Sequence, residues 1–158
     1  MSTHSPNQLT GVERHALTLI RELRHQTLMG KLPKAFERPE HLAHYVIARY
    51  HGHVQLRTTK LARELGVTVR TLQRSFLKTF RTSMKAFQIE TRLKFAQYLL
   101  SNNPDLKMSV IAKELGYNDP NVFERFFHEH AGNSPYAWSE AERARRLAES
   151  SDDLDSNS

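Results

Sequence analysis

The side chains best suited to chemistry in this chain are arginines and lysines gathered in its middle. Between Arg57 and Lys94 there are ten Lys or Arg residues and two Glu residues, a net charge of +8. Between Asp105 and Gly132 there are three Lys or Arg and five Asp or Glu, a net charge of −2. Because guanidinium and ammonium groups bind anionic oxygens, the uneven distribution predicts a polyanionic partner for the middle segment. The overall charge of +6 is weaker support, since many proteins are basic.

Other kinds of chemistry find little support in the residue types. Cysteine is absent, which excludes disulfides, thiolate metal sites and a cysteine nucleophile, and suits a reducing compartment. His41 and His44 are three apart, with His51 and His53 nearby, but metal-site spacing such as HExxH is missing. We expect polar surface histidines, no metal and no cofactor. Without paired carboxylates, a Gly-rich phosphate loop or a catalytic triad, we expect no enzyme activity.

The chain shows no sign of a membrane or secretory destination. No stretch approaches the roughly 18 apolar residues that a membrane span needs. Residues 1–9 lack a basic start followed by an apolar run, so they do not form a secretory signal. We therefore expect a cytoplasmic protein with no membrane partner.

Capping residues, glycine stops and 3.6-residue periodicity predict an all-α fold, because no segment alternates as a strand would. The expected helices cover residues 11–29, 39–50, 58–65, 69–80, 84–101, 109–115, 120–130 and 135–147. Thr10 and Glu13 have the spacing of a capping box at the first of them. Residues 1–9 and the acidic, serine-rich tail 148–158 offer little to bury, so we expect both to be disordered.

An internal repeat with a period of about 50 residues organises the chain. At an offset of 50, the residues Leu56, Leu61, Ala62, Glu64, Leu65 and Gly66 match Leu106, Ile111, Ala112, Glu114, Leu115 and Gly116. After the glycine the offset is 51, and Leu72, Arg74, Phe76, Ser83 and Phe87 match Phe123, Arg125, Phe127, Ser134 and Trp138. Each copy thus consists of a short helix, a glycine turn and a second helix with one apolar face.

This pattern is typical of a helix-turn-helix unit. The alanine allows the two helices to approach closely, and the glycine permits the left-handed turn between them. Leu72 and Phe76, like Phe123 and Phe127, are four residues apart, so each pair lies on one face and anchors its helix. The opposite face of each second helix then remains available for DNA. A duplicated helical hairpin without a DNA role is the alternative, which the charge pattern disfavours.

The helix of residues 84–101 lies between the two copies. At 1.5 Å per residue it spans roughly 27 Å, while successive major grooves on one side of B-DNA lie about 34 Å apart. We therefore hypothesise that one chain reads two adjacent major-groove segments. We expect Leu93, Ala96 and Leu99-Leu100 to form the buried stripe of this helix, flanked by Arg92.

The segment from about residue 40 to 138 resembles the DNA-binding domain of the AraC/XylS family. In the first half the resemblance is carried by Leu61-Ala62, Gly66-Val67-Thr68, Leu72-Gln73-Arg74-Ser75-Phe76, Arg92-Leu93, Ala96 and Leu99-Leu100. The second half contributes Val110-Ile111-Ala112, Gly116-Tyr117, Phe123-Glu124-Arg125, Phe127 and Gly132-Asn133-Ser134-Pro135. The resemblance implies two homeodomain-like three-helix lobes joined by a long linker helix. It also implies a bacterial, nucleoid-associated regulator that usually activates transcription and contacts RNA polymerase.

Two positions depart from the family pattern. Arg81 stands where the family usually has a glycine after the first recognition helix, which puts the local turn geometry in question. Ser139 stands where the family usually has the arginine of a Pro-x-x-Tyr-Arg ending, so a basic contact is missing there.

The resemblance assigns base-contacting positions to each recognition helix. They fall on Arg70, Thr71, Gln73 and Arg74 in the first copy and on Asn121, Val122 and Arg125 in the second. Their chemistry agrees, because Arg pairs with guanine, Gln and Asn pair with adenine, and apolar groups touch the thymine methyl. For each residue, an ordinary solvated helix face is the alternative.

A second set of polar and basic residues is suited to phosphate contacts, which position the protein without reading sequence. The candidates are Thr58, Thr59, Lys60, Lys78, Arg81 and Lys85, with ordinary surface charge as the alternative for each. Since the first copy is strongly basic and the second slightly acidic, we expect the first lobe to supply most of the affinity. We expect the second lobe to be more selective or more weakly engaged.

The domain organisation follows from these assignments. Residues 1–38 form an N-terminal extension, residues 39–147 the DNA-binding domain and residues 148–158 the tail. Within the domain, the first helix-turn-helix covers about 56–80, the linker helix 84–101 and the second helix-turn-helix about 106–131. The stripe of the extra helix, residues 11–29, must be buried, either on the first lobe or in a homodimer or another protein partner.

Two functions from different classes remain at this stage. The first is a sequence-specific, double-stranded DNA-binding transcription regulator, an activator in preference to a repressor, that inserts two recognition helices into adjacent major grooves. The second is a nucleoid or accessory DNA-binding protein with little sequence preference, for which binding to random DNA would be almost as tight as to any selected site.

Overall fold

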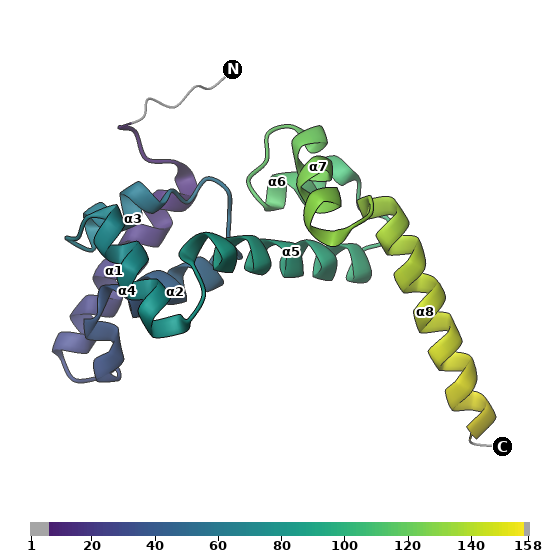
Figure 1. The fold of residues 1–158 in the computed structure, drawn as a ribbon, viewed down its shortest axis with the longest axis horizontal. Helices are drawn as coiled ribbons and strands as arrows, with labels where there is room; N and C mark the ends of the chain where they lie inside the picture. The colour runs from purple at the N-terminus through teal and green to yellow at the C-terminus, as the bar shows by residue number, and fades with distance from the viewer. Residues whose placement is uncertain (1–6, 157–158) are drawn as a thin grey trace. The chain divides into compact units, whose positions relative to one another are not determined.

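The computed structural model describes residues 7–156, in which every regular element is a helix (Figure 1). The helices are α1 (Gly11–Leu28), the short 3-10 helix η1 (Lys34–Glu37), α2 (Pro39–Arg49), α3 (Thr58–Glu64), α4 (Val69–Phe80), α5 (Met84–Asn102), α6 (Met108–Glu114), α7 (Pro120–Ala131) and α8 (Pro135–Ser156). The all-α prediction is confirmed. None of the helices within residues 7–156 combines the length and apolar character that crossing a bilayer requires.

The chain divides into two compact units, Met1–Arg92 and Leu93–Ser158, and α5 continues from one into the other. The first unit contains α1 to α4 and the start of α5. Its core is built around Leu72 and Phe76 of α4, which are completely buried together with Ile47 of α2 and Leu61 of α3. The second helix of the helix-turn-helix is therefore held by its apolar face, as the four-residue spacing predicts.

Helix α1 is an integral part of this core. Its stripe residues Ala16 and Ile20 are completely buried within the same cluster as the residues of α2, α3 and α4. Of the two alternatives for this helix, packing on the first lobe is the one the structure confirms. The apolar stripe is thereby covered by the chain itself.

Polar contacts also attach α1 to the end of α3. The guanidinium of Arg24 donates hydrogen bonds to the backbone carbonyls of Glu64 and Leu65, and each donor–acceptor distance is 3.0 Å. The last carbonyls of a helix have no partner within it, so Arg24 satisfies groups that would otherwise need water. Arg21 adds an exposed ion pair, 2.7 Å from its Nε to Oε1 of Glu64.

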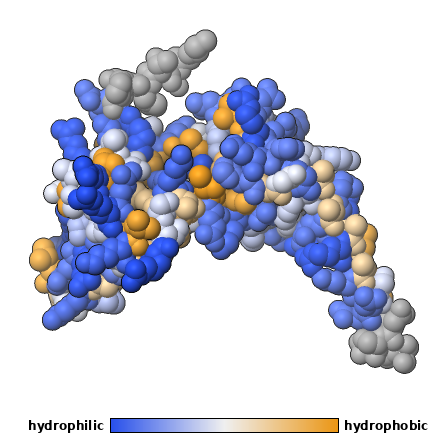
Figure 2. All heavy atoms as spheres, in the orientation of Figure 1, coloured by the Kyte–Doolittle hydropathy of each residue, from blue (hydrophilic) through white to orange (hydrophobic). Residues whose placement is uncertain are grey.

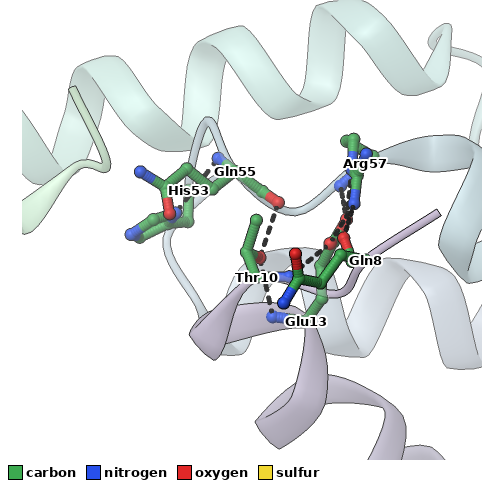
Figure 3. A network of polar contacts seen from close by, with 6 residues as sticks. All are labelled: Gln8, Thr10, Glu13, His53, Gln55 and Arg57. Atoms are coloured by element: carbon green, nitrogen blue, oxygen red, sulfur yellow. Dashed lines mark hydrogen bonds and ion pairs between the residues drawn. The ribbon is translucent and has the colours of Figure 1, made fainter. Parts of the chain in front are cut away.

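Glu13 joins the start of α1 to the loop before α3 (Figure 3). Its carboxylate accepts from the Thr10 backbone N–H at 2.9 Å, while the Thr10 hydroxyl accepts from the Glu13 N–H at 3.2 Å. The predicted capping box is thus confirmed. The same carboxylate accepts from Arg57 Nε at 2.9 Å and Nη2 at 2.8 Å and from the Arg57 backbone N–H at 3.0 Å. The Glu13 side chain has no exposed surface and is fully bonded, while the Arg57 side chain of this ion pair remains 33% exposed.

The glycine turns of the two repeat copies have the same backbone geometry. Gly66 has φ +73° and is followed by a hydrogen bond from Val67 N–H to the Ala62 carbonyl at 3.0 Å. Gly116 has φ +94° and is followed by the equivalent bond from Tyr117 N–H to the Ala112 carbonyl at 2.9 Å. These are helix ends in which the left-handed residue permits the closing bond, and glycine adopts this conformation without strain.

The ends of the two recognition helices also match, although their residues differ. Arg81 adopts the left-handed conformation at φ +59°, and its N–H donates to the Leu77 carbonyl at 2.9 Å. Gly132 ends α7 in the same way, at φ +88°, with its N–H 3.0 Å from the His128 carbonyl. Arg81 therefore preserves the turn that glycine usually makes, at the expense of backbone strain.

A close backbone approach fixes the start of α5 against the first unit. A Cβ on Gly52 would lie 2.4 Å from the Gln88 carbonyl oxygen, which no side chain tolerates. Arg92 Nε donates to the Gly52 carbonyl at 2.7 Å. Gly52 is thus required both for its φ of +66° and for the space it leaves to α5.

The second unit repeats the arrangement of the first around an aromatic core. Phe123 and Phe127 of α7 are completely buried, beside Ile111 of α6. Trp138 of α8 packs edge-on to Phe127 with ring centres 5.9 Å apart. The end of α5 contributes Ala96 and Leu100, both buried, while Leu93 and Leu99 are half-buried. The predicted stripe of the linker helix is thus present, with Arg92 bonded at its flank.

The predicted disorder at the two ends is wrong for the described residues. Helix α8 continues to Ser156 instead of ending near Leu147, because Arg145 pairs with Glu142 and Glu149 along the helix. Hydrogen bonds from Arg145 hold the pKa of Glu142 below its usual value. At the other end, the Gln8 carbonyl accepts from Arg57 at 2.7 Å. Residues 1–6 and 157–158, the remainder of these predictions, lie outside the described residues.

The Glu13–Arg57 pair predicts an acid-dependent stability. Burial raises the pKa of Glu13, but the hydrogen bonds from Arg57 and Thr10 outweigh it and lower the pKa to about 2 from 4.5. The carboxylate therefore stabilises the fold fully above about pH 4.5, and this contribution disappears as the pH falls toward 2. We expect Glu13→Gln to lower the free energy of unfolding at pH 7 by about 3 kcal/mol, and this deficit to shrink between pH 4.5 and 2.

Urea unfolding followed by circular dichroism at several pH values measures this effect. Glu22→Gln, at an exposed position on the same helix, is the matched control and should change stability by less than about 0.5 kcal/mol. A Glu13→Gln deficit that stays the same at every pH would contradict the account.

The left-handed Arg81 predicts a stabilising substitution. Arg81→Gly removes the strain of a side chain at φ +59° and should raise the free energy of unfolding by about 1 kcal/mol. Lys78→Gly, inside the same helix, should lower it by about 1 kcal/mol. Thermal or urea unfolding of both variants distinguishes the two effects, and a loss of stability in Arg81→Gly would show that the arginine side chain outweighs the strain.

Candidate nucleic-acid interface

Helix α4 is oriented by its cap and by its buried face. The Thr68 hydroxyl accepts from the Thr71 backbone N–H at 3.1 Å, which begins the helix. Leu72 and Phe76 are directed into the core with no exposed surface. The opposite side of the helix is therefore directed outward and carries the predicted base-contacting residues, whereas Val69 and Phe80 pack against the core.

The outward face of α4 is a stripe of polar and basic side chains, which we call the α4 face. Its members are Arg70, Gln73, Arg74, Lys78 and Arg81, and all five are exposed. Arg70, Arg74, Lys78 and Arg81 follow one another at three- and four-residue intervals, and Gln73 lies three residues after Arg70 on the same side of the helix. Among the described residues, no side chain or backbone group forms a hydrogen bond or ion pair with any of these five side chains. Their donors thus remain available to a ligand.

Thr71 lies at the edge of the α4 face but is partly engaged. It is exposed, and its hydroxyl oxygen accepts from the Thr68 hydroxyl at 2.9 Å. The methyl group of Thr71 remains suited to an apolar contact, while the hydroxyl already takes part in the helix cap.

The predicted phosphate-contacting residues divide into two groups. Thr59, Lys78, Arg81 and Lys85 are exposed. Thr58 is half-buried and lies 3.5 Å from the amide nitrogen of Gln88.

Lys60 differs from the other candidates because it is only 8% exposed. It lines a hollow of about 240 Å³ together with Leu17 and Arg21 of α1. The sequence pattern did not reveal that α1 covers this flank of α3. Lys60 is therefore not exposed for a phosphate contact as predicted.

Several charges counted in the sequence serve the fold instead. Arg57 is bound to Glu13, and Arg92 donates to the Gly52 carbonyl. Glu64, one of the two acids in the basic segment, is paired with Arg21 of α1. The positive charge available to a ligand is thus concentrated on the α4 face.

Helix α7 presents the corresponding surface in the second unit. Asp119 begins the helix by accepting from the Asn121 backbone N–H at 2.9 Å, and Phe123 and Phe127 bury the inner face. Asn121 and Arg125 are exposed, and so is Val122 at 43%. Within residues 7–156, the Arg125 side chain forms no hydrogen bond or ion pair. The predicted residues of the second copy therefore share one outward surface.

The 51-residue offset identifies further members of this α7 face. Glu124, His128 and Glu129 stand at the positions of Gln73, Leu77 and Lys78, and all six side chains are exposed. Glu124 was missed in the motif comparison, although the repeat itself contains the signal, since it aligns with the base-contacting position of Gln73. An acid at this position accepts hydrogen bonds, as the amino group of cytosine would provide.

The two faces consequently carry opposite charge. The α4 face has four basic residues, Arg70, Arg74, Lys78 and Arg81, and no acid. At the equivalent positions the α7 face has Arg125 with the acids Glu124 and Glu129. The charge difference predicted for the two copies is therefore present on the surfaces themselves.

His41 and His44 pack against aromatic rings and are not the polar surface groups expected, whereas His51 is exposed as predicted. His44 stacks on Phe80 at 4.3 Å and on Phe87 at 4.2 Å between ring centres, and His41 meets Phe80 edge-on at 5.2 Å. Burial, with a smaller contribution from His41, lowers the pKa of His44. In the part of the chain that the structure describes, no three His, Asp or Glu side chains are grouped as metal ligands would be.

Comparison with known proteins agrees with this architecture. Residues 61–141, slightly more than half of the chain, match the family described as a helix-turn-helix domain. The Msm operon regulatory protein of Streptococcus mutans is 32% identical over 80 residues, a match that covers 51% of this chain. The chain spans only 28% of the length of that relative.

Solved structures share the fold. The DNA-binding domain of AdpA, described as a global transcriptional factor and solved with a target DNA, is 26% identical with a TM-score of 0.61, covering 69% of this chain and 96% of that one. The C-terminal domain of the response regulator yesN from Fusobacterium nucleatum is 23% identical with a TM-score of 0.58, covering 63% of this chain and 95% of that one. Family and fold are those of DNA-binding transcription regulators and not of enzymes, and the chain belongs to the AraC-type helix-turn-helix family.

Proposed function

We propose that this protein is a sequence-specific regulator that places α4 and α7 in two adjacent major grooves of duplex DNA and activates transcription. The observation that supports this most strongly is the α4 face, on which five polar or basic side chains are exposed and unbonded among the described residues. A major groove accepts an α-helix, and its base edges present the acceptors and donors that such side chains recognise.

In the first lobe, Arg70 and Arg74 are suited to guanine and Gln73 to adenine, with Thr71 offering its methyl to thymine. Lys78, Arg81, Lys85 and Thr59 are exposed near them and supply phosphate contacts. Thr58 is a weaker phosphate candidate, because it is half-buried. In the second lobe, Asn121 is suited to adenine, Val122 to the thymine methyl, Arg125 to guanine and Glu124 to cytosine.

Two observations support DNA reading by both α4 and α7: the internal repeat and the length of the linker helix α5. Helix α5 has 19 residues and therefore a length of about 28 Å. Two adjacent major grooves on one side of a duplex lie about 34 Å apart. The AdpA domain, which was solved with a target DNA, has the same fold over 96% of its length.

Activation, a contact with RNA polymerase and association with the nucleoid are proposed from the family resemblance. The name of the Streptococcus mutans relative describes an operon regulator, which agrees with control of transcription. A promoter–reporter assay with purified polymerase tests the sign of regulation: activation requires more transcript with the protein than without it, and less transcript would indicate repression.

Selection of bound sites from random duplexes tests sequence-specific reading. We expect an enriched motif, and we expect specific binding to be at least about 10³-fold tighter than binding to random DNA. Repeating the measurement at two salt concentrations gives the number of phosphate contacts from the slope. Near-equal affinity for selected and random DNA would instead indicate the accessory, low-specificity protein.

The charge difference between the faces predicts different effects of two equivalent arginines. We expect Arg74→Ala to weaken specific binding by about 1–3 kcal/mol, more than Arg125→Ala does, because the α4 face supplies most of the attraction to phosphate-lined grooves. Fluorescence anisotropy on the selected site measures both, with Arg143→Ala on α8 as a control that should leave affinity unchanged. A larger loss in Arg125→Ala would reverse the assignment of the lobes.

Glu124 predicts a preference for cytosine at one position of the second half-site. In Glu124→Gln the amide should shift that preference toward adenine by about 1–3 kcal/mol, since Gln pairs with adenine and a carboxylate with cytosine. Site selection with the wild type and the variant measures the change. If affinity rises equally for all sequences and the motif stays the same, Glu124 acts through its charge alone and reads no base.

A further inference from the structure

The C-terminal part of α8 presents an apolar stripe that is largely exposed, although Leu147 also borders a hollow lined by Leu100 and Pro104. Every side chain from Arg143 to Leu154 is exposed, including Leu147 at 64% and Leu154 at 73%. Ala144, Leu147, Ser151 and Leu154 follow one another at three- and four-residue intervals, and Ala148 lies four residues after Ala144, so all five lie on one face. Figure 2 shows a row of apolar residues along this helix. We call these five residues the α8 stripe.

Charges along α8 are arranged in two blocks. Arg143, Arg145 and Arg146 lie in the middle of the helix, whereas Glu149, Asp152 and Asp153 lie toward its C-terminal end. Negative side chains at a helix C-terminus oppose the helix dipole, and although Glu149 already pairs with Arg145 within α8, the acidic block as a whole is unfavourably placed with respect to the dipole. A neighbour that brings positive charge to this end would compensate for it.

We propose that the α8 stripe is a self-association surface, on which α8 of a second copy of this chain packs antiparallel. In such a pair the acidic end of each helix lies beside the arginine block of the other, so both ends are compensated by one arrangement. Placing Leu147 of one copy against Ser151 of the other also places Leu154 over Ala144. A large side chain then meets a small one, which is how facing helices interdigitate.

The charge complementarity is the reason for proposing a second copy of this chain as the partner of the α8 stripe. A helix that carries both charge blocks and the stripe matches itself when it is reversed, and such isologous contacts generate closed dimers. A contact between two single helices is small, so we expect a dissociation constant of roughly 10–100 µM. The proposal does not depend on the function proposed above, because it concerns only α8.

Sedimentation velocity of the full chain over a range of concentrations tests the proposal. We expect the apparent mass to rise from the 18.3 kDa of one chain toward twice that value, with the midpoint shifted to higher concentration by added salt. Leu154→Glu should abolish the rise, because it introduces a charge into the stripe. A single 18.3 kDa species up to 0.5 mM, roughly ten times the middle of the expected range, would overturn the proposal.

Charge inversion tests the antiparallel register. Arg145 and Asp152 are seven residues apart and therefore lie on the same flank of α8, beside the stripe. Arg145→Glu and Asp152→Lys should each lower self-association at least tenfold, and an equimolar mixture of the two variants should restore it as a heterodimer. Asp153→Lys is the matched control, since Asp153 is turned about 100° further around the helix and away from the stripe.

Circular dichroism of each variant separates loss of pairing from loss of helix, because Arg145 also pairs with Glu142 and Glu149 within α8. Equal effects of Asp152→Lys and Asp153→Lys, or no restoration in the mixture, would overturn the antiparallel arrangement. Dimers that persist in Leu154→Glu would place self-association elsewhere and overturn the proposal as a whole. The exposed Leu28 and Met29 at the end of α1 would then be the next surface to test.

Discussion

The structure depends on the burial of one apolar pair on each recognition helix. Leu72 and Phe76 of α4, and Phe123 and Phe127 of α7, are four residues apart and have no exposed surface. Burying two such side chains contributes about 3–6 kcal/mol, and the polar residues opposite are favourably hydrated where they face solvent. The same interaction that stabilises each lobe therefore determines which side chains face outward. In this protein the stability of a lobe and the composition of its candidate interface are two consequences of a single helix orientation.

The N-terminal helix adds a second layer of support to the first lobe. It buries Ala16 and Ile20 in the common core, satisfies the last carbonyls of α3 through Arg24 and holds the loop before α3 through Glu13. These contacts reduce the positive charge available at the surface, because Arg57 is paired with Glu13 and Lys60 is buried beside α1. The α4 face is thus more sharply defined than the basic segment of the sequence implied. The second lobe has no such helix in the described chain, and its support comes from α8 and the end of α5.

Helix positions, the repeat and the outward faces were predictable from the sequence because they depend on local rules. Periodicity, glycine at the turns and capping residues act over a few residues, and the predicted boundaries agree with the observed helices to within one or two residues for α1 to α7. The burial of Lys60, the ring stacking of His44 and the left-handed Arg81 depend on residues far apart or on tertiary packing, and no local pattern reports them. Glu124 is different, because the repeat contained its equivalence to Gln73 and only the comparison of motifs overlooked it. The continuation of α8 was missed because composition suggested disorder, whereas ion pairs along the helix support it.

We propose that two equivalent helices, α4 and α7, read two major-groove segments of one duplex. Methylation interference at guanine N7 on a selected site measures this most directly, because N7 lies in the major groove where Arg binds. The account predicts two clusters of interfering guanines on one side of the duplex, about 10–10.5 base pairs apart, with the cluster lost in Arg125→Ala different from the one lost in Arg74→Ala. A single cluster, or the same cluster lost in both variants, would contradict it.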